Sequence, residues 1–260
     1  MCAIFLKSAA QTPEIDYPDS DGQPMAETPL HGCVMVDLKR ALQSRYEERP
    51  DIYVEGNMFL YYKEGDPSAC LAPDVFLVQG VAKDPYRRIY QLWKEGPGPS
   101  FVIEVTSKTT RREEDRKKSK YRQLGVEEYF LFDPLGDYLR PRLQGFRLTG
   151  GEYLPMTPRW DGALSSQVTG LDLLPEGENL RLVDVVSGER LLWGKEIEQL
   201  ARQQTERADQ QAQRADQEAR RADQEARRRE QETRRAEAAE QRLRALEEEM
   251  ARLRRERIDE

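Results

Sequence analysis

Apolar positions in the first two thirds of the chain follow a helical period and then a strand period. Residues 31–48 carry apolar side chains at four-residue spacing, which predicts a helix with one apolar face: Val34, Leu38, Leu42 and Tyr46. Three later segments are rich in β-branched and aromatic residues, which predicts a strand in each: 51–62, 73–81 and 101–107.

A second helix and a fourth strand follow these three strands. Residues 109–125 predict a helix that ends at Gly125, and residues 127–134 predict a strand that Pro134 stops. From there to about residue 193, Gly and Pro divide the chain into short strands. The order is α-β-β-β-α-β with a β-rich extension, which predicts an α/β domain around a small mixed sheet.

The composition changes at about residue 195, which predicts a domain at 1–195 and a helical tail at 196–260. The tail is made largely of Ala, Gln, Glu and Arg without Gly or Pro, and RADQ recurs at 207–210, 214–217 and 221–224. Its small and apolar residues follow a heptad with one three-residue phase slip: Ala208, Ala212, Ala215, Ala219, Ala222, Ala226, Ala236, Ala239, Leu243, Leu246, Met250 and Leu253.

This pattern predicts a coiled-coil helix that binds a second copy or another protein. Alanine buries little area, so we expect homo-oligomer formation to depend on the Leu-containing end. A lone solvated helix held by Glu–Arg pairs is the alternative.

The charge is unevenly distributed along the chain. The net charge is −7, residues 201–260 contain 16 Arg and 16 acidic residues, and residues 1–200 contain 25 basic and 32 acidic residues. An acidic body argues against strong standing affinity for nucleic acid, although a local basic groove remains compatible with it.

Cysteine usage and hydropathy predict a cytoplasmic protein. Cys2, Cys33 and Cys70 are scattered and form no CxxC pair, so neither a disulfide framework nor a zinc cluster is indicated. The first apolar run is too short for a signal-peptide core, and no stretch approaches a membrane span.

Two carboxylates stand out in the predicted sheet. Asp74 opens the second strand directly after Pro73, and Glu104 lies in the middle of the third, on the same face as Thr106 and Lys108. Burying a carboxylate costs free energy unless a cation or hydrogen-bond donors replace its water. One interpretation is therefore that Glu104 lies on an edge strand or in a buried ion pair. The other is a divalent-metal site, because Mg²⁺ binds few protein carboxylates and leaves positions for water and phosphate oxygens.

Several segments resemble the Uma2 family of the restriction-endonuclease-like, PD-(D/E)XK superfamily. They are APDVFLVQGV, PSFVIEVTSKTTRREEDRKKSKYRQLGVEEYFLFDP, LQGFRL and GEYLPM, and the resemblance runs from about Asp21 to Leu192. It implies a restriction-endonuclease-like fold and an endonuclease that depends on Mg²⁺ or Mn²⁺ and hydrolyses DNA. By motif position it assigns the metal to Asp74 and Glu104.

The motif lysine is displaced in this sequence. It should lie two residues after the glutamate, where the chain has Thr106. The family pattern has a lysine four residues before the tyrosine of the following helix, which is Lys117 before Tyr121, so the resemblance assigns the catalytic lysine to Lys117. Lys108 and Lys120 are alternative candidates for this lysine. A third possibility is that the charged cluster of this helix is only a solvated face.

The resemblance also covers the segment DGQPMAETPLH, where Glu27 could supply a further acid and His31 is the only histidine. A lone histidine at a helix start is more often structural. The chain contains neither GxxxxGK[ST] nor GxGxxG, so nucleotide-driven chemistry is not indicated. We therefore expect a Mg²⁺-dependent DNA endonuclease. The alternative is a catalytically idle nucleic-acid-binding or scaffolding protein that acts through its tail.

Overall fold

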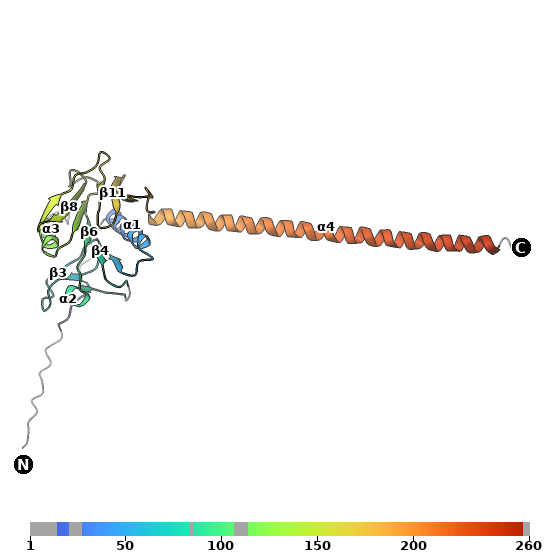
Figure 1. Cartoon of the computed structure of the whole chain (residues 1–260), viewed down its shortest axis with the longest axis horizontal. Coiled ribbons are helices and arrows are strands. Elements are labelled where there is room, and N and C mark those ends of the chain that lie inside the picture. The colour runs from blue at the N-terminus through green and yellow to red at the C-terminus, as the bar shows by residue number, and fades with distance from the viewer. Residues whose placement is uncertain (1–14, 21–27, 84–85, 107–113, 257–260) are drawn as a thin grey trace, which may run out of the picture. The chain divides into compact units, whose positions relative to one another are not determined.

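The computed structural model describes residues 15–20, 28–83, 86–106 and 114–256. The chain divides into two compact units, residues 1–197 and 198–260, and each is considered by itself (Figure 1). Among the described residues, no helix is both long enough and apolar enough to cross a membrane.

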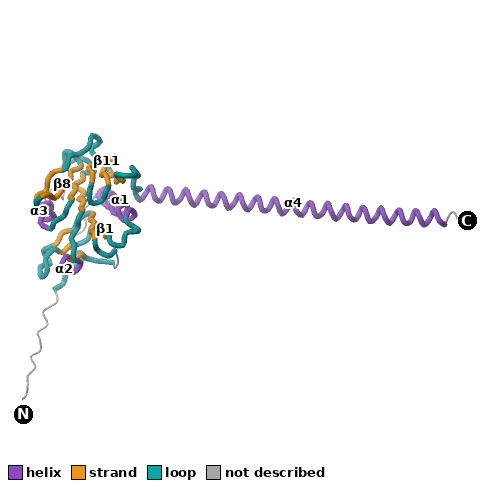
Figure 2. Tube along the Cα trace, in the orientation of Figure 1, coloured by secondary structure: helices purple, strands orange, loops and turns teal. Residues whose placement is uncertain are grey.

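A six-stranded mixed sheet forms the centre of the first unit, whose strands are orange in Figure 2. Its strand order is β1-β4-β6-β7-β8-β9. Only β6 and β7 pair in parallel, and the other neighbours are antiparallel. The strands are β1 (Ile52–Glu55), β4 (Val75–Gln79), β6 (Phe101–Val105), β7 (Glu128–Phe132), β8 (Leu143–Thr149) and β9 (Glu152–Pro155).

The predicted α-β-β-β-α-β order is confirmed by the elements around this sheet. The helix α1 (Pro29–Arg45) precedes β1, β4 and β6, and α3 (Glu114–Gln123) connects the parallel strands β6 and β7. Parallel neighbours need such a crossover because a tight turn cannot join them.

The two helices cover opposite faces of the sheet. The apolar face predicted for α1 is buried at Val34, Leu38, Leu42 and Tyr46, in the same cluster as Phe101, Ile103 and Val105 of β6. On the other face, Tyr121 of α3 packs in a second cluster that contains Val102. Alternate residues of β6 thus face different helices, as the two-residue period of a strand requires.

The strand predicted over residues 51–62 is wrong as one element, because the chain leaves the sheet at Gly56. Asn57 has a positive φ of 52°, and the chain then enters β2 (Leu60–Tyr61) of a separate sheet. That sheet has the order β3-β2-β5, with β3 (Cys70–Leu71) and β5 (Tyr90–Gln91), and the short helix α2 (Leu92–Glu95) follows it.

The β-rich extension predicted after Pro134 is confirmed. Its first two strands, β8 and β9, join the central sheet, and β10 (Leu164–Ser165), β11 (Leu171–Glu176) and β12 (Asn179–Asp184) form one antiparallel sheet. The buried Glu128 of β7 connects the central sheet to the segment between β10 and β11, because its carboxylate accepts hydrogen bonds from Ser166 Oγ and from the Gln167 amide. Arg147 of β8 donates to the same carboxylate.

The predicted long C-terminal helix is confirmed as α4 (Gly194–Glu256), which has 63 residues. Five ion pairs one turn apart support its exposed surface: Asp216–Arg220, Asp223–Arg227, Arg228–Glu232, Glu225–Arg229 and Glu230–Arg234. Leu243, Leu246 and Met250 are exposed, and the side chain of Leu253 lies outside the described part. Coiled-coil pairing of α4 stays a prediction.

Candidate active site

Asp74 and Glu104 lie close together where β4 begins beside β6. The antiparallel pairing of β4 and β6 ends with Val75 opposite Ile103, and Asp74 is the residue directly before β4. The Asp74 carboxylate lies near enough to raise the pKa of Glu104. The Val105 amide also donates a hydrogen bond of 2.7 Å to Asp74 Oδ2, which fixes this carboxylate beside the end of β6.

The start of β4 is held tightly by the turn that follows β1. The Asn57 amide donates to the Pro73 carbonyl at 2.9 Å. A Cβ added at Gly56 would lie 2.1 Å from the carbonyl oxygen of Asp74, so any side chain at this position would force the backbone to shift. Glycine at position 56 therefore allows the backbone approach that positions Asp74.

Glu104 is buried, and two side chains of α3 contact its carboxylate. Its exposed fraction is 4%, Lys117 Nζ lies 2.8 Å from its Oε2, and the Tyr121 hydroxyl donates to its Oε1 at 2.6 Å. Lys117 and Tyr121 are four residues apart and so share one helix face. The helix thereby supplies a cation and a hydrogen-bond donor to a carboxylate in the sheet.

The electrostatics of Glu104 follow from this environment. Burial raises the pKa of Glu104 to about 7, while Lys117 lowers it and the nearby Asp74 carboxylate raises it further. Burial, together with the charge of Glu104, also raises the pKa of Tyr121 well above its usual range. The phenol therefore remains a donor at neutral pH.

His31 is brought to the same site from the first turn of α1. The Thr28 hydroxyl caps this helix by accepting a hydrogen bond from the His31 amide at 3.3 Å. The imidazole is 2% exposed, and its Nε2 lies 3.3 Å from Asp74 Oδ2. Three elements, α1, β4 and β6, thus meet at the Asp74 carboxylate.

The other candidates from the sequence are not brought to this site or cannot be placed. Lys120 donates to Gln123 at 3.0 Å and lies over the Tyr62 ring, 4.9 Å from its centroid. Lys108 and Glu27 lie outside the described residues. Thr106, which occupies the position of the motif lysine, is buried at the end of β6.

Sequence reasoning left out three contacts of the site: the hydrogen bond from Tyr121, the amide of Val105 and the close approach of Gly56. The spacing of Lys117 and Tyr121 could have indicated the first, since both must face the same strand. The other two depend on strand pairing and on a chain turn that leave no periodic signal in the sequence.

The arrangement offers carboxylate oxygens, a lysine and a tyrosine hydroxyl in one buried place. Carboxylate oxygens are the ligands that hard divalent cations prefer. Within the described ranges, no group of three or more His, Cys, Asp or Glu side chains gathers as a ready metal cluster. A metal here would therefore rest on the two carboxylates and take its remaining ligands from water or substrate.

The chain is similar to one protein family and to solved structures. No curated protein matches the chain. A crystal structure from Anabaena variabilis, described as "a putative nuclease belonging to DUF820", matches with a TM-score of 0.42 and 12% identity, over 55% of this chain and 75% of that chain. The model of the Uma2 family, described as "Putative restriction endonuclease", matches residues 4–182, which is more than half of the chain. The chain belongs to the Uma2 family.

Proposed function

We propose that this protein is a metal-dependent endonuclease that uses Mg²⁺ or Mn²⁺ to hydrolyse phosphodiester bonds of DNA. One observation carries the proposal: two buried carboxylates lie close together, Asp74 directly before β4 and Glu104 on β6, and Lys117 contacts Glu104. Membership of a family of restriction-endonuclease-like proteins supports the reaction class.

The residues of the site fit a hard divalent cation. Asp74 and Glu104 would hold it, because both supply carboxylate oxygens from adjacent strands. Thr106 Oγ1 is buried and has no hydrogen-bond partner among the described residues, so the site contains a further oxygen that is not yet satisfied. When bound, Mg²⁺ supplies a Lewis acid that polarises the phosphate and makes a bound water more acidic.

The protein's own side chains would divide the remaining work. Hydrolysis forms a bond between a water oxygen and phosphorus, breaks the bond from phosphorus to the leaving sugar oxygen, and moves a proton from the water to that leaving oxygen. Lys117 would orient the water and offset the negative charge that develops on phosphorus. Tyr121 would hold Glu104 in place through its hydrogen bond, and His31 would do the same for Asp74.

The partners in this proposal are DNA and a second copy of the chain. We propose that the chain works in the cytoplasm and forms a homo-oligomer through the Leu-containing end of α4. The alternative is a catalytically idle nucleic-acid-binding or scaffolding protein. Two observations favour it: Thr106 stands where the motif lysine should be, and residues 1–200 carry a net negative charge. The contact between Lys117 and Glu104 favours the enzyme, because α3 thereby brings a positive charge to the Glu104 carboxylate on β6.

A plasmid-cleavage assay with purified full-length protein tests the proposal. Supercoiled DNA should be nicked or linearised with Mg²⁺ or Mn²⁺ and left intact with EDTA, and Glu104→Gln should abolish cutting. Glu152→Gln, at an exposed position on β9, is the matched control and should cut normally. Cutting that survives both EDTA and Glu104→Gln would contradict the proposal, and so would an inactive wild type on DNA and on RNA.

A further inference from the structure

The residues of α4 between 205 and 239 separate by chemistry around the helix. If the alanine positions are taken as a and d of a heptad, Ala212, Ala219 and Ala226 fall at a, and Ala208, Ala215, Ala222 and Ala236 fall at d. We call this set the alanine seam. All of these side chains are exposed in α4, so the seam is an unpartnered face of the helix.

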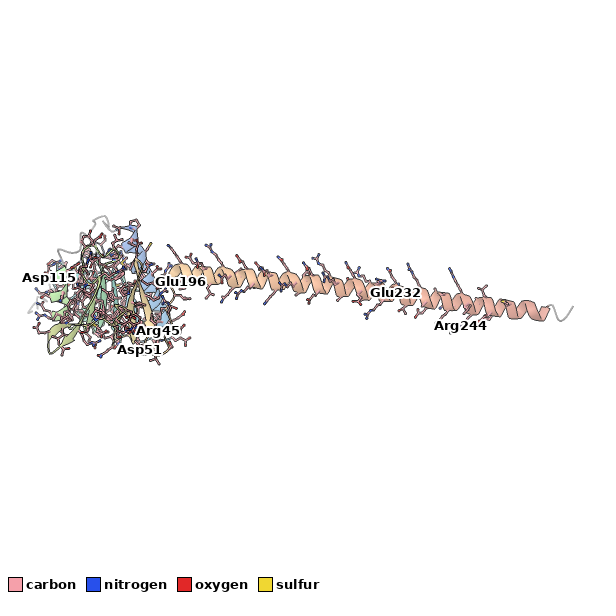
Figure 3. The ribbon with its side chains drawn as sticks, turned by 90° about the horizontal axis from the view of Figure 1, so that it is seen from above. Arg45, Asp51, Asp115, Glu196, Glu232 and Arg244 are labelled. Atoms are coloured by element: carbon pink, nitrogen blue, oxygen red, sulfur yellow. The ribbon has the colours of Figure 1, made fainter. Side chains whose placement is uncertain are left out.

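The positions that flank the alanine seam are acidic on both sides. In residues 209–237, positions e and g contain eight carboxylates and no basic residue: Asp209, Asp216, Glu218, Asp223, Glu225, Glu230, Glu232 and Glu237. Eight of the nine arginines lie farther from the seam, at b and c, and the ninth, Arg229, occupies a d position within the seam. Glutamine occupies f from 210 to 231. Glu232 is labelled on α4 in Figure 3. We call the seam and these carboxylates together the acid-flanked face.

This arrangement disfavours pairing of the face with a second copy of itself. In a parallel pair each g residue meets an e residue of the other helix, so Glu218 would meet Asp223 and Glu225 would meet Glu230. In an antiparallel pair e meets e and g meets g, which again places carboxylate against carboxylate. Alanine buries little area and lets the two backbones come close, so little hydrophobic stabilisation opposes this repulsion.

Ion pairs within the helix leave the carboxylates available. Asp216 pairs with Arg220 and Asp223 with Arg227, and all four side chains are well exposed. Exposed pairs of this kind contribute little free energy. A partner with basic flanks could therefore replace them at small cost.

The distal end of the tail has a different pattern. The seam continues after its phase slip with Leu243, Leu246 and Met250. In that register Arg242 falls at g and Glu247 at e, so a parallel pair would place an arginine against a glutamate. The distal end is thus suited to self-pairing, whereas the acid-flanked face is not.

We propose that the acid-flanked face is a docking site for an α-helix of another protein, whose seam of small apolar residues is flanked by lysine or arginine. Charge complementarity selects this occupant, because acidic flanks repel both a second copy and the phosphates of a nucleic acid. The helix would lie along the alanine seam, with its basic side chains against the e and g carboxylates.

Two synthetic peptides test this with the full-length protein. One has the native sequence 205–239. The other keeps every uncharged residue, and each acidic residue is replaced by lysine and each arginine by glutamate. The native segment has nine acidic residues and nine arginines, so both peptides are neutral. They differ in which charge flanks the seam and in the one charged residue within it, position 229, which is Arg in the native peptide and Glu in the other.

Calorimetric titration should show that the charge-inverted peptide binds at least about tenfold more tightly than the native peptide, with an affinity that falls as salt is raised. Replacing Asp216, Glu218, Asp223 and Glu225 of the protein by glutamine should remove this preference. The matched change of Arg207, Arg214, Arg221 and Arg228 to glutamine should keep it. Equal binding of both peptides, tighter binding of the native one, or no binding of either overturns the proposal.

Discussion

Lys117 Nζ lies 2.8 Å from Glu104 Oε2, so a helix supplies to the sheet the cation that the strand itself lacks at Thr106. One turn later on the same helix face, Tyr121 donates to the other oxygen of Glu104. The two contacts fix the orientation of a buried carboxylate next to Asp74. They also hold α3 against the sheet, because Lys117, Tyr121 and Glu104 are all largely or fully buried.

Replacing Lys117 should separate catalysis from binding. Lys117→Ala should lower the turnover number by a factor on the order of 10²–10³, because a group that orients water acts mainly in the transition state. DNA affinity should change by less than about threefold. Lys120→Ala is the control from the same helix and should retain activity, since Lys120 contacts Gln123 instead. Single-turnover cleavage and a gel-shift titration measure the two quantities, and equal effects of both variants would refute the assignment.

The raised pKa of Glu104 predicts a pH-dependent stability of the metal-free protein. The folded-state pKa is about 7 and lies above the ordinary value of 4.5. The folded state thus binds the extra proton between these values, and stability should fall as pH rises through that window. Glu104→Gln removes this titrating group. The free energy of unfolding of the variant minus that of the wild type should therefore increase from pH 5 to pH 7.5.

Urea unfolding in EDTA at several pH values measures this difference. Lys117 and Tyr121 remain present in the Glu104→Gln variant, so the comparison isolates the carboxyl proton. A difference in unfolding free energy that stays constant from pH 5 to pH 7.5, or that shrinks, would show that Glu104 does not titrate in this window.

Gly56 provides a test of how Asp74 is positioned. Gly56→Ala would place a Cβ 2.1 Å from the Asp74 carbonyl oxygen, so β4 must shift, at a cost above about 1 kcal/mol. Metal affinity and cleavage should fall with it. Gly32→Ala in α1 is the matched control, because nothing lies within 4 Å of the added Cβ, and a helical alanine should stabilise by up to about 1 kcal/mol. Thermal unfolding and metal titration compare them, and unchanged metal binding in Gly56→Ala would speak against this role.

The tail should control assembly through its distal end. Changing Leu243, Leu246 and Met250 together to Gln should lower the particle mass in sedimentation equilibrium, because these side chains supply most of the apolar area of the seam. Changing Ala212, Ala215 and Ala219 to Gln should leave the mass unchanged. Cleavage per active site should survive deletion of residues 201–260. Equal masses for the Leu-region variant and the wild type would contradict self-association through this end.

The sequence predicted the main elements well where a period was long enough to be read. The α1 face of Val34, Leu38, Leu42 and Tyr46 is buried in full, because four consecutive turns carry the signal. The small sheet of β2, β3 and β5 was not predicted, since strands of two residues show no alternation. The break at Gly56 was missed for a related reason: a tertiary contact with the Asp74 backbone causes it, and no turn motif marks it.

The candidate site was predictable only in part. Local alternation placed Glu104 in a strand, and the family pattern indicated Asp74 and Lys117. That Asp74 lies close to Glu104 depends on the pairing of β4 and β6, which are separated by the 21 residues 80–100. The position of His31 beside Asp74 depends on how α1 packs on the sheet, which a single sequence does not specify. The metal and the role of each residue stay predictions.

The most direct test of the metal site is a crystal structure of the protein soaked with Mn²⁺, using anomalous scattering to locate the ion. We predict one peak that lies within about 2.0–2.3 Å of a carboxylate oxygen of Asp74 and of a carboxylate oxygen of Glu104. The peak should disappear in Glu104→Gln. A peak bound elsewhere, or no peak in crystals of a protein that cuts DNA with Mn²⁺, would contradict the assignment of these two residues as the metal ligands.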